Sequence, residues 1–158
     1  MPDGRLCQTV SLAARFRSNA ATILITHDLA LIAEYADRVV VMYGGKVVEV
    51  ADVFSIFSSC RHPYTLGLMS SLPRLDVDLE QLEPIPGSPP SLIDLPTGCS
   101  FHPRCRVSKD RKICRTEVPP LRDVGGGIEA ACHFAEEVPA ERAVVSGEIG
   151  IQLGTARS

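Results

Sequence analysis

Short apolar runs mark the strands expected in the first third of the chain. Residues 21–26 (ATILIT) form a compact β-branched run typical of a buried parallel strand, and residues 38–43 (RVVVMY) form a second buried run. The pair Gly44-Gly45 separates this second run from residues 46–50 (KVVEV), which predicts a tight hairpin. The pattern indicates an α/β unit.

Apolar residues at helical spacing predict three short helices around these strands. Each helix has a residue suited to its start: Asp28 and Asp52 as N-caps and Pro63 in a first turn. The residues expected on their apolar faces are Leu29, Ile32, Ala33 and Ala36, then Val53, Phe54, Ile56 and Phe57, then Tyr64, Leu68, Met69 and Leu72. A weaker pattern (Val10, Ala13, Ala14 and Phe16) indicates a helix within residues 1–20.

The pattern changes from Pro73 onward. Six prolines lie between residues 84 and 103, which is too many for a regular helix or a central strand, so we expect an extended segment. Residues 138–158 end in small and polar side chains, and we expect a disordered tail there. The predicted organisation is an α/β unit over residues 1–72, an irregular extension over residues 73–137, and the tail.

The extension contains four cysteines with the spacing C-x5-C-x8-C-x17-C: Cys99, Cys105, Cys114 and Cys132. Four thiols in so short a segment indicate one shared ligand. Four thiolates suit either tetrahedral zinc or an iron–sulfur cluster. Zinc modules favour shorter C-x2-C or C-x4-C spacings, but spacing alone leaves the two nearly equal. Unligated buried thiols are the remaining interpretation.

Composition and charge narrow the function. A net charge of -3 and a pI near 5.8 argue against nucleic-acid binding. No apolar run approaches the ~18 residues of a membrane span, and the start has no signal-peptide pattern. We therefore expect a cytoplasmic protein with reduced thiols. Cys7 and Cys60 are expected as buried or free thiols, and the basic run Arg104–Lys112 as a solvated loop that balances a cluster's charge.

Several segments together resemble one family. Residues 21–50 read ATILITHDLALIAEYADRVVVMYGGKVVEV, and HPYTLGLMSSLPRL begins at His62. IPGSPPSLIDLPTGCSFHPRC, CRTEVPPL and ACHF follow in the extension. These segments resemble the ATP-binding subunits of dipeptide and oligopeptide ABC importers.

The resemblance implies a fold and a set of site residues. Residues 1–72 would be the C-terminal remnant of a P-loop ABC ATPase domain, followed by a small irregular iron–sulfur-type extension. His27 would be the switch histidine that contacts the γ-phosphate and helps to position the attacking water, with Asp28 as an N-cap. Cys99, Cys105, Cys114 and Cys132 would bind a [4Fe-4S] cluster, with zinc as the alternative, acting as a structural staple or a redox sensor. The full-length family also uses ATP and magnesium.

The sequence also departs from the family. It contains no G-x-x-x-x-G-K-[ST] phosphate loop, no LSGGQ-type signature and no Walker B Asp-Glu pair. Ala51 and Cys60 are smaller departures. We therefore expect the C-terminal part of a longer subunit, from a truncated or broken reading frame, that is not active alone.

The partners implied by the resemblance are a second ATP-binding subunit, integral-membrane permease subunits and an extracytoplasmic peptide-binding protein, with no nucleic acid. The expected location is the cytoplasmic face of the membrane, held there through the permease. The alternatives are a non-catalytic metal-binding interaction module or a decayed gene product, and, more weakly, a small redox protein.

Overall fold

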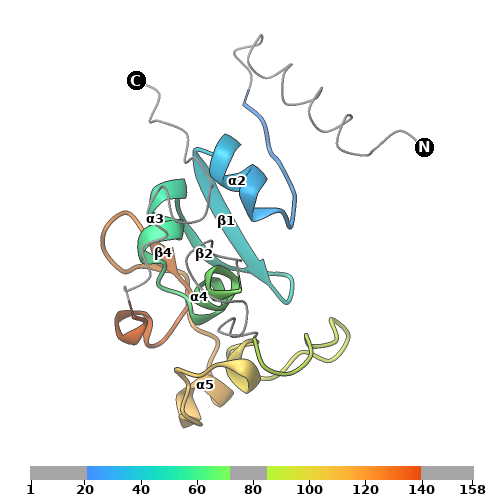
Figure 1. Cartoon of the computed structure of the whole chain (residues 1–158). Coiled ribbons are helices and arrows are strands. Elements are labelled where there is room, and N and C mark those ends of the chain that lie inside the picture. Colours follow the sequence, from blue (N-terminus) through green and yellow to red (C-terminus); the bar gives the residue numbers. More distant parts are fainter. Residues whose placement is uncertain (1–20, 72–84, 140–158) are drawn as a thin grey trace, which may run out of the picture.

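The computed structural model describes residues 21–71 and 85–139 (Figure 1). The helix expected within residues 1–20, Leu72 and nearly all of the expected tail lie outside the described residues. Among the helices of the described part, none is long and apolar enough to cross a membrane.

A four-stranded antiparallel sheet forms the centre of the described structure. Its order is β1 (Arg38–Tyr43), β2 (Lys46–Asp52), β4 (Glu129–Ala130) and β3 (Arg122–Asp123). The predicted hairpin between β1 and β2 is confirmed, and its turn residues Gly44 and Gly45 have φ values of 56° and 75°. These left-handed values suit glycine and give a two-residue turn that follows the twist of the strands.

The three predicted helices are α2 (Leu29–Tyr35), α3 (Val53–Ser59) and α4 (Pro63–Ser70). Asp28 Oδ1 accepts from the Ala30 N–H at 2.9 Å, and Asp52 Oδ1 accepts from the Ser55 N–H at 3.0 Å, so both predicted N-caps are confirmed. The extension adds the 3-10 turn η2 (His102–Arg104), α5 (Lys112–Thr116) and the 3-10 turn η3 (Ala135–Glu137).

The main core lies between α2, α3, α4 and the sheet. It includes most of the described side chains predicted for the apolar faces of these helices. The exceptions are Phe54, which is 42% exposed, Tyr64, which packs against Tyr43 and Phe101 instead, and Leu68, which is half-buried and not among the core members. Ile128, from the extension, belongs to the same core. Its buried members are Ala33, Val39, Ala51, Val53, Ile56, Phe57, Cys60, Met69 and Ile128.

The prediction of a buried strand at residues 21–26 is wrong for this structure. The segment has no regular structure, and Ile23 and Ile25 are 91% and 94% exposed. A parallel strand forms only by pairing with neighbours, and no described strand pairs with this segment. β1 is likewise buried on one face only: Val39 and Tyr43 face inward, whereas Val40 and Met42 are more than half exposed.

An aromatic cluster joins the extension to the hairpin. The Tyr43 ring lies 4.7 Å from the Tyr64 ring and 5.1 Å from the Phe101 ring, measured between centroids. Ile85 packs against this cluster, and residues 85–98 form neither helix nor strand, in keeping with their prolines. Because β4 pairs with β2 and β3 pairs with β4, the sheet takes strands from both predicted units, and the division at residue 73 stays a prediction.

Candidate metal centre

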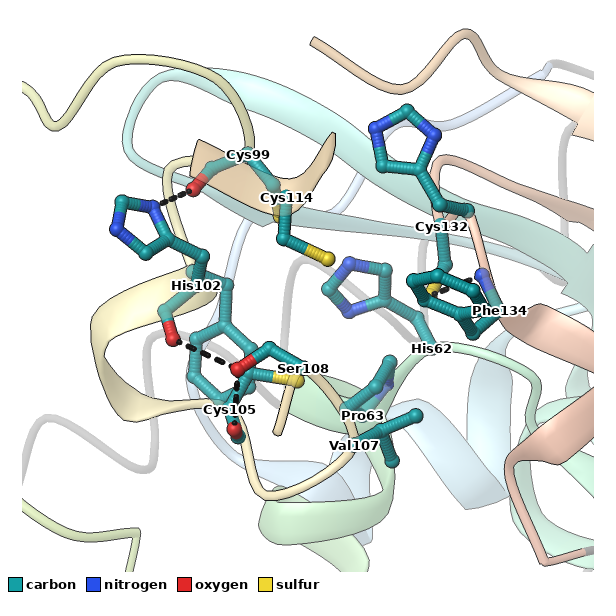
Figure 2. A pocket seen from close by; sticks show the side chains of 12 residues that line it. His62, Pro63, Cys99, His102, Cys105, Val107, Ser108, Cys114, Cys132 and Phe134 are labelled. Atoms are coloured by element: carbon teal, nitrogen blue, oxygen red, sulfur yellow. Dashed lines mark hydrogen bonds between the residues drawn. The ribbon is translucent and has the colours of Figure 1, made fainter. Parts of the chain in front are cut away.

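All four cysteines of the extension line one small cavity (Figure 2). Cys99 precedes η2, Cys105 ends it, Cys114 lies in α5 and Cys132 follows β4. Cys114 and Cys132 are buried, and Cys99 and Cys105 are half-buried. The free space between them is about 10 Å³, which suits about one water molecule.

Backbone contacts hold the first and third cysteines together. The Cys99 N–H donates to the Cys114 carbonyl at 2.9 Å, and the Thr97 hydroxyl donates to the Arg115 carbonyl at 2.9 Å. Gly98 makes this approach feasible, because a Cβ there would lie 2.6 Å from the Cys114 carbonyl oxygen. Its φ of 69° is also a value that glycine tolerates best.

Short-range hydrogen bonds order the loops that carry Cys99 and Cys105. The Cys99 carbonyl lies 2.9 Å from His102 Nδ1, and the Cys105 carbonyl accepts from the Ser108 hydroxyl at 2.9 Å. The residues next to Cys99 and Cys105 in the sequence therefore help to order the loops that carry these two cysteines.

The environment of the thiols favours their protonated form. Burial raises the pKa of all four, that of Cys132 to about 12, and the neighbouring cysteines raise the pKa of Cys105, Cys114 and Cys132 further. Four adjacent thiolates would repel one another, so a bound cation or iron cluster is what would stabilise them together.

Backbone N–H groups face three of the sulfurs and oppose this effect. The Phe134 N–H donates to Cys132 Sγ at 3.4 Å. The N–H groups of Phe101 and His102 lower the pKa of Cys99, and those of Val107 and Ser108 lower the pKa of Cys105. Such N–H donors stabilise thiolate ligands and tune iron–sulfur clusters.

The basic run around the cysteines is only partly a solvated loop. Arg111 makes a two-bond ion pair with Glu137, at 2.8 and 2.9 Å, and its guanidinium carbon lies 3.8 Å from the Phe134 ring centroid. Arg104 donates to the carbonyls of residues 85–87 and to the Tyr43 hydroxyl. Lys109 and Lys112 are exposed as predicted, whereas Arg104 and Arg111 make contacts that hold the extension together.

No three His, Cys, Asp or Glu side chains within residues 21–71 and 85–139 are grouped as the ligands of a metal ion. The donor set itself fits both groups considered from the sequence, because four thiols on one cavity match a [4Fe-4S] cluster or tetrahedral zinc. The N–H groups that face the sulfurs add to this fit.

The structure does not bring His27 to the cysteines. His27 is exposed, precedes α2 and is not among the residues that line the cysteine cavity. Asp28 beside it serves as the helix cap. Cys60 is buried in the main core, and burial raises its pKa to about 12, which confirms it as a buried thiol. Cys7 lies outside the described residues.

Two buried polar residues near the start of α4 were not predicted from the sequence. His62 is 1% exposed and lines the cavity with the cysteines, and Glu49 on β2 is fully buried and accepts from the Arg61 N–H. The only signal in the sequence for His62 is its position before Pro63 at the start of a helix, where it acts as the N-cap. Glu49 interrupts an apolar strand, and its position facing the start of α4 depends on tertiary packing.

Comparisons with known proteins match the same region. The family described as "Oligopeptide/dipeptide transporter, C-terminal region" matches residues 48–114. A dipeptide transport ATP-binding protein, DppD, of Caldanaerobacter subterraneus is 46% identical over 115 residues, which are 73% of this chain and 35% of that protein. DppD of Escherichia coli is 46% identical over 118 residues, 75% of this chain and 36% of that protein.

A third relative is a longer protein that matches this chain with a similar identity. The oligopeptide transport ATP-binding protein OppD of Mycobacterium bovis is 49% identical over 127 residues, 80% of this chain and 20% of that protein. The chain thus spans about a third or less of the curated relatives it matches. On these residues, the chain belongs to the family of ATP-binding subunits of dipeptide and oligopeptide ABC importers and corresponds to their C-terminal part.

Proposed function

We propose that the chain is part of the ATP-binding subunit that energises peptide import by ATP binding and hydrolysis. The observation that carries the proposal is the match of residues 48–114 to the C-terminal region of peptide transporters. The proposed partners are a second ATP-binding subunit, membrane permease subunits and an extracytoplasmic peptide-binding protein. The proposed location is the cytoplasmic face of the membrane.

Co-purification tests this assignment. The tagged chain is co-expressed with the permease and the sister ATP-binding subunit from the same transport system, and membranes are solubilised in mild detergent. We expect the permease or the sister subunit to elute with the chain. Recovery of the chain alone, with both partners present in the membrane, would contradict the proposal.

His27 is proposed as the switch histidine that contacts the γ-phosphate. An imidazole can donate a hydrogen bond to phosphate oxygens, but phosphoryl transfer also needs a phosphate cradle and a magnesium ligand. The 158 residues contain no G-x-x-x-x-G-K-[ST] sequence. The purified chain is therefore expected to show no magnesium-dependent ATP hydrolysis. Measurable ATP hydrolysis by the purified chain that is lost in the His27→Ala variant would contradict this prediction.

We propose a [4Fe-4S] cluster held by Cys99, Cys105, Cys114 and Cys132, with zinc as the alternative. The support is the donor set on one cavity, the N–H groups that face three sulfurs, and the positive charges of Lys46 and Arg111. When bound, such a cluster supplies a one-electron redox group. With all four ligands from cysteine, its proposed role is a structural staple or a sensor.

Metal analysis of anaerobically purified protein tests the cofactor. We expect about four iron and four sulfide per chain and a broad visible charge-transfer band that Cys114→Ser removes. The matched control is Cys60→Ala, which removes a buried thiol outside the cavity and should leave the band unchanged. About one zinc per chain, without iron, would support the alternative, and no metal in a folded chain would reject both.

A second candidate is a non-catalytic metal-binding interaction module. The observation in its favour is that the cysteine cavity is built within the described residues, whereas His27 lies exposed and apart from it. Co-purification with the permease and sister subunit favours the transporter role. A metal-loaded chain that binds neither favours the interaction module.

A further inference from the structure

The buried ring of His62 lies where the sheet, α4 and the cysteine loops meet. His62 is 1% exposed and lines the same cavity as the four thiols. Figure 2 shows its ring in the wall of this cavity, between Cys114 and Cys132. A buried imidazole in such a place needs hydrogen-bond partners for both ring nitrogens.

Both partners are backbone groups on different segments. Nδ1 accepts from the Tyr64 N–H at 3.1 Å and thereby caps α4. The backbone of Ala131, the residue before Cys132, acts on the ring as a hydrogen-bond acceptor and opposes the lowering of its pKa by burial. Since Nδ1 accepts from the Tyr64 N–H, the proton lies on Nε2, which can donate to the Ala131 carbonyl. Burial lowers the pKa of His62 to about 4, so the ring stays neutral in this form.

The surroundings of the ring fix it from two further directions. Its centroid lies 5.9 Å from that of Phe101, on the loop that carries Cys99 and Cys105. On the other side, the Ala131 N–H donates to the Val48 carbonyl at 2.8 Å, so Ala131 is anchored both to β2 and to His62. The Arg61 N–H donates to the buried carboxylate of Glu49, which fixes the chain just before the ring.

We propose that His62 is the positioning residue of the cysteine centre: its ring joins the first turn of α4 to the Cys132 segment and holds Cys132 toward the other three thiols. The proposal deepens the metal centre proposed above and rests on it for its function. The positioning itself belongs to the protein chain and is measurable without metal.

Two substitutions separate the two hydrogen bonds of the ring. His62→Asn keeps a side-chain acceptor suited to the N-cap of α4 but is too short to reach Ala131, whereas His62→Ala removes both contacts. The matched control is His133→Asn, because His133 also lines the cavity but is bonded to the Glu117 carbonyl.

The first measurement is the alkylation rate of each cysteine in metal-free protein, resolved by peptide mass spectrometry. We expect the rate at Cys132 to rise about tenfold in both His62 variants, the order expected for loss of one net hydrogen bond. The rate at Cys60 should not change, and His133→Asn should resemble the wild type. An unchanged Cys132 rate in folded His62→Asn would overturn the proposal.

The second measurement is the half-life of the metal-loaded centre in air, followed by its visible band. We expect a shorter half-life in His62→Asn than in His133→Asn. If the wild type takes up neither iron nor zinc while the Cys132 rate rises in His62→Asn, the proposed cofactor fails and the positioning stands. If the wild type binds iron or zinc and His62→Asn matches the wild type in both measurements, the role proposed for His62 is rejected while the proposed cofactor stands.

A spectroscopic measurement on the wild type keeps the proposal testable if both His62 variants unfold. Nitrogen NMR of the imidazole should show Nε2 protonated, with slow proton exchange because the N–H is buried and bonded. A proton on Nδ1, or rapid exchange at Nε2, would contradict the proposed contact with Ala131.

Discussion

At the scale of single residues, Glu49 is the most unusual group of the fold. It lies on β2, fully buried, and Oε1 accepts from the Arg61 N–H. Its second oxygen and the nearby Thr65 hydroxyl make no hydrogen bond of ordinary geometry among the described residues, although this hydroxyl acts to lower the pKa of the carboxyl. Burial raises the pKa of the Glu49 carboxyl above its usual value of 4.5, although the Arg61 N–H acts in the opposite direction.

The raised pKa predicts how stability varies with pH. An acid whose pKa is raised by folding binds more protons in the folded state than in the unfolded state. The contribution of Glu49 to the free energy of unfolding is therefore fully present at low pH. It is lost as the pH rises from 4.5 through the raised pKa of the folded state. Glu49→Gln keeps the size and removes this titration. We expect the variant to gain about 1 kcal/mol over the wild type between pH 5 and pH 8, in urea unfolding. A stability difference that is constant across this interval would contradict the prediction.

Gly98 predicts a second effect at this scale. Gly98→Ala would place a methyl group 2.6 Å from the Cys114 carbonyl oxygen and disturb the hydrogen bond from the Cys99 N–H. The control is Gly126→Ala, which has a similar φ of 66° but nothing within 4 Å of the added carbon. We expect the control to lose about 1 kcal/mol from its backbone conformation and Gly98→Ala to lose about 3 kcal/mol, measured by thermal unfolding. Equal losses would show that the close approach is unimportant.

At the scale of elements, residues near the helix starts predicted the helices, whereas the strands depend on pairing with other strands. Asp28, Asp52 and Pro63 lie where the helices begin, because capping depends on residues a few positions apart. β3 and β4 have two residues each and exist only through their pairing with β2 and each other. No local pattern marks such short strands, and for the same reason the apolar run at residues 21–26 did not suffice to make a strand.

The N-cap of α3 provides the test at this scale. Asp52 accepts from the Ser55 N–H and from the Ser55 hydroxyl, and burial of Val53, Ile56 and Phe57 depends on the helix that it starts. We expect Asp52→Ala to lower the free energy of unfolding by about 1 kcal/mol and Asp52→Asn to cost less than half of that, because Asn is an equally good cap. If Asp52→Ala and Asp52→Asn lower the free energy of unfolding equally in chemical denaturation, the effect comes from the charge of Asp52 and not from its capping hydrogen bond.

At the scale of the whole molecule, the cysteine spacing predicted one shared ligand; the structure places the four thiols on one cavity, whose surroundings the spacing did not indicate. The four thiols come together because the extension folds back onto the hairpin through Tyr43, Tyr64 and Phe101. Those contacts join segments far apart in the sequence, so His62 and Glu49 gave no sign of their positions. The identity of a bound ligand depends on chemistry that spacing leaves open, since zinc and a cluster use the same thiols.

The two faces of β1 give the last prediction. β1 is an edge of the described sheet, and its outer face carries Val40 at 53% and Met42 at 55% exposure, whereas Val39 is 8% exposed. An edge strand with an exposed apolar face favours association between chains. We expect Val40→Lys to reduce concentration-dependent light scattering while changing the free energy of unfolding by less than about 0.5 kcal/mol. Val39→Lys, one residue away, should cost more than about 3 kcal/mol because it buries a charge. If Val40→Lys destabilises the chain as much as Val39→Lys does, the outer face is covered in solution, and the strand is buried on both faces as its sequence first indicated.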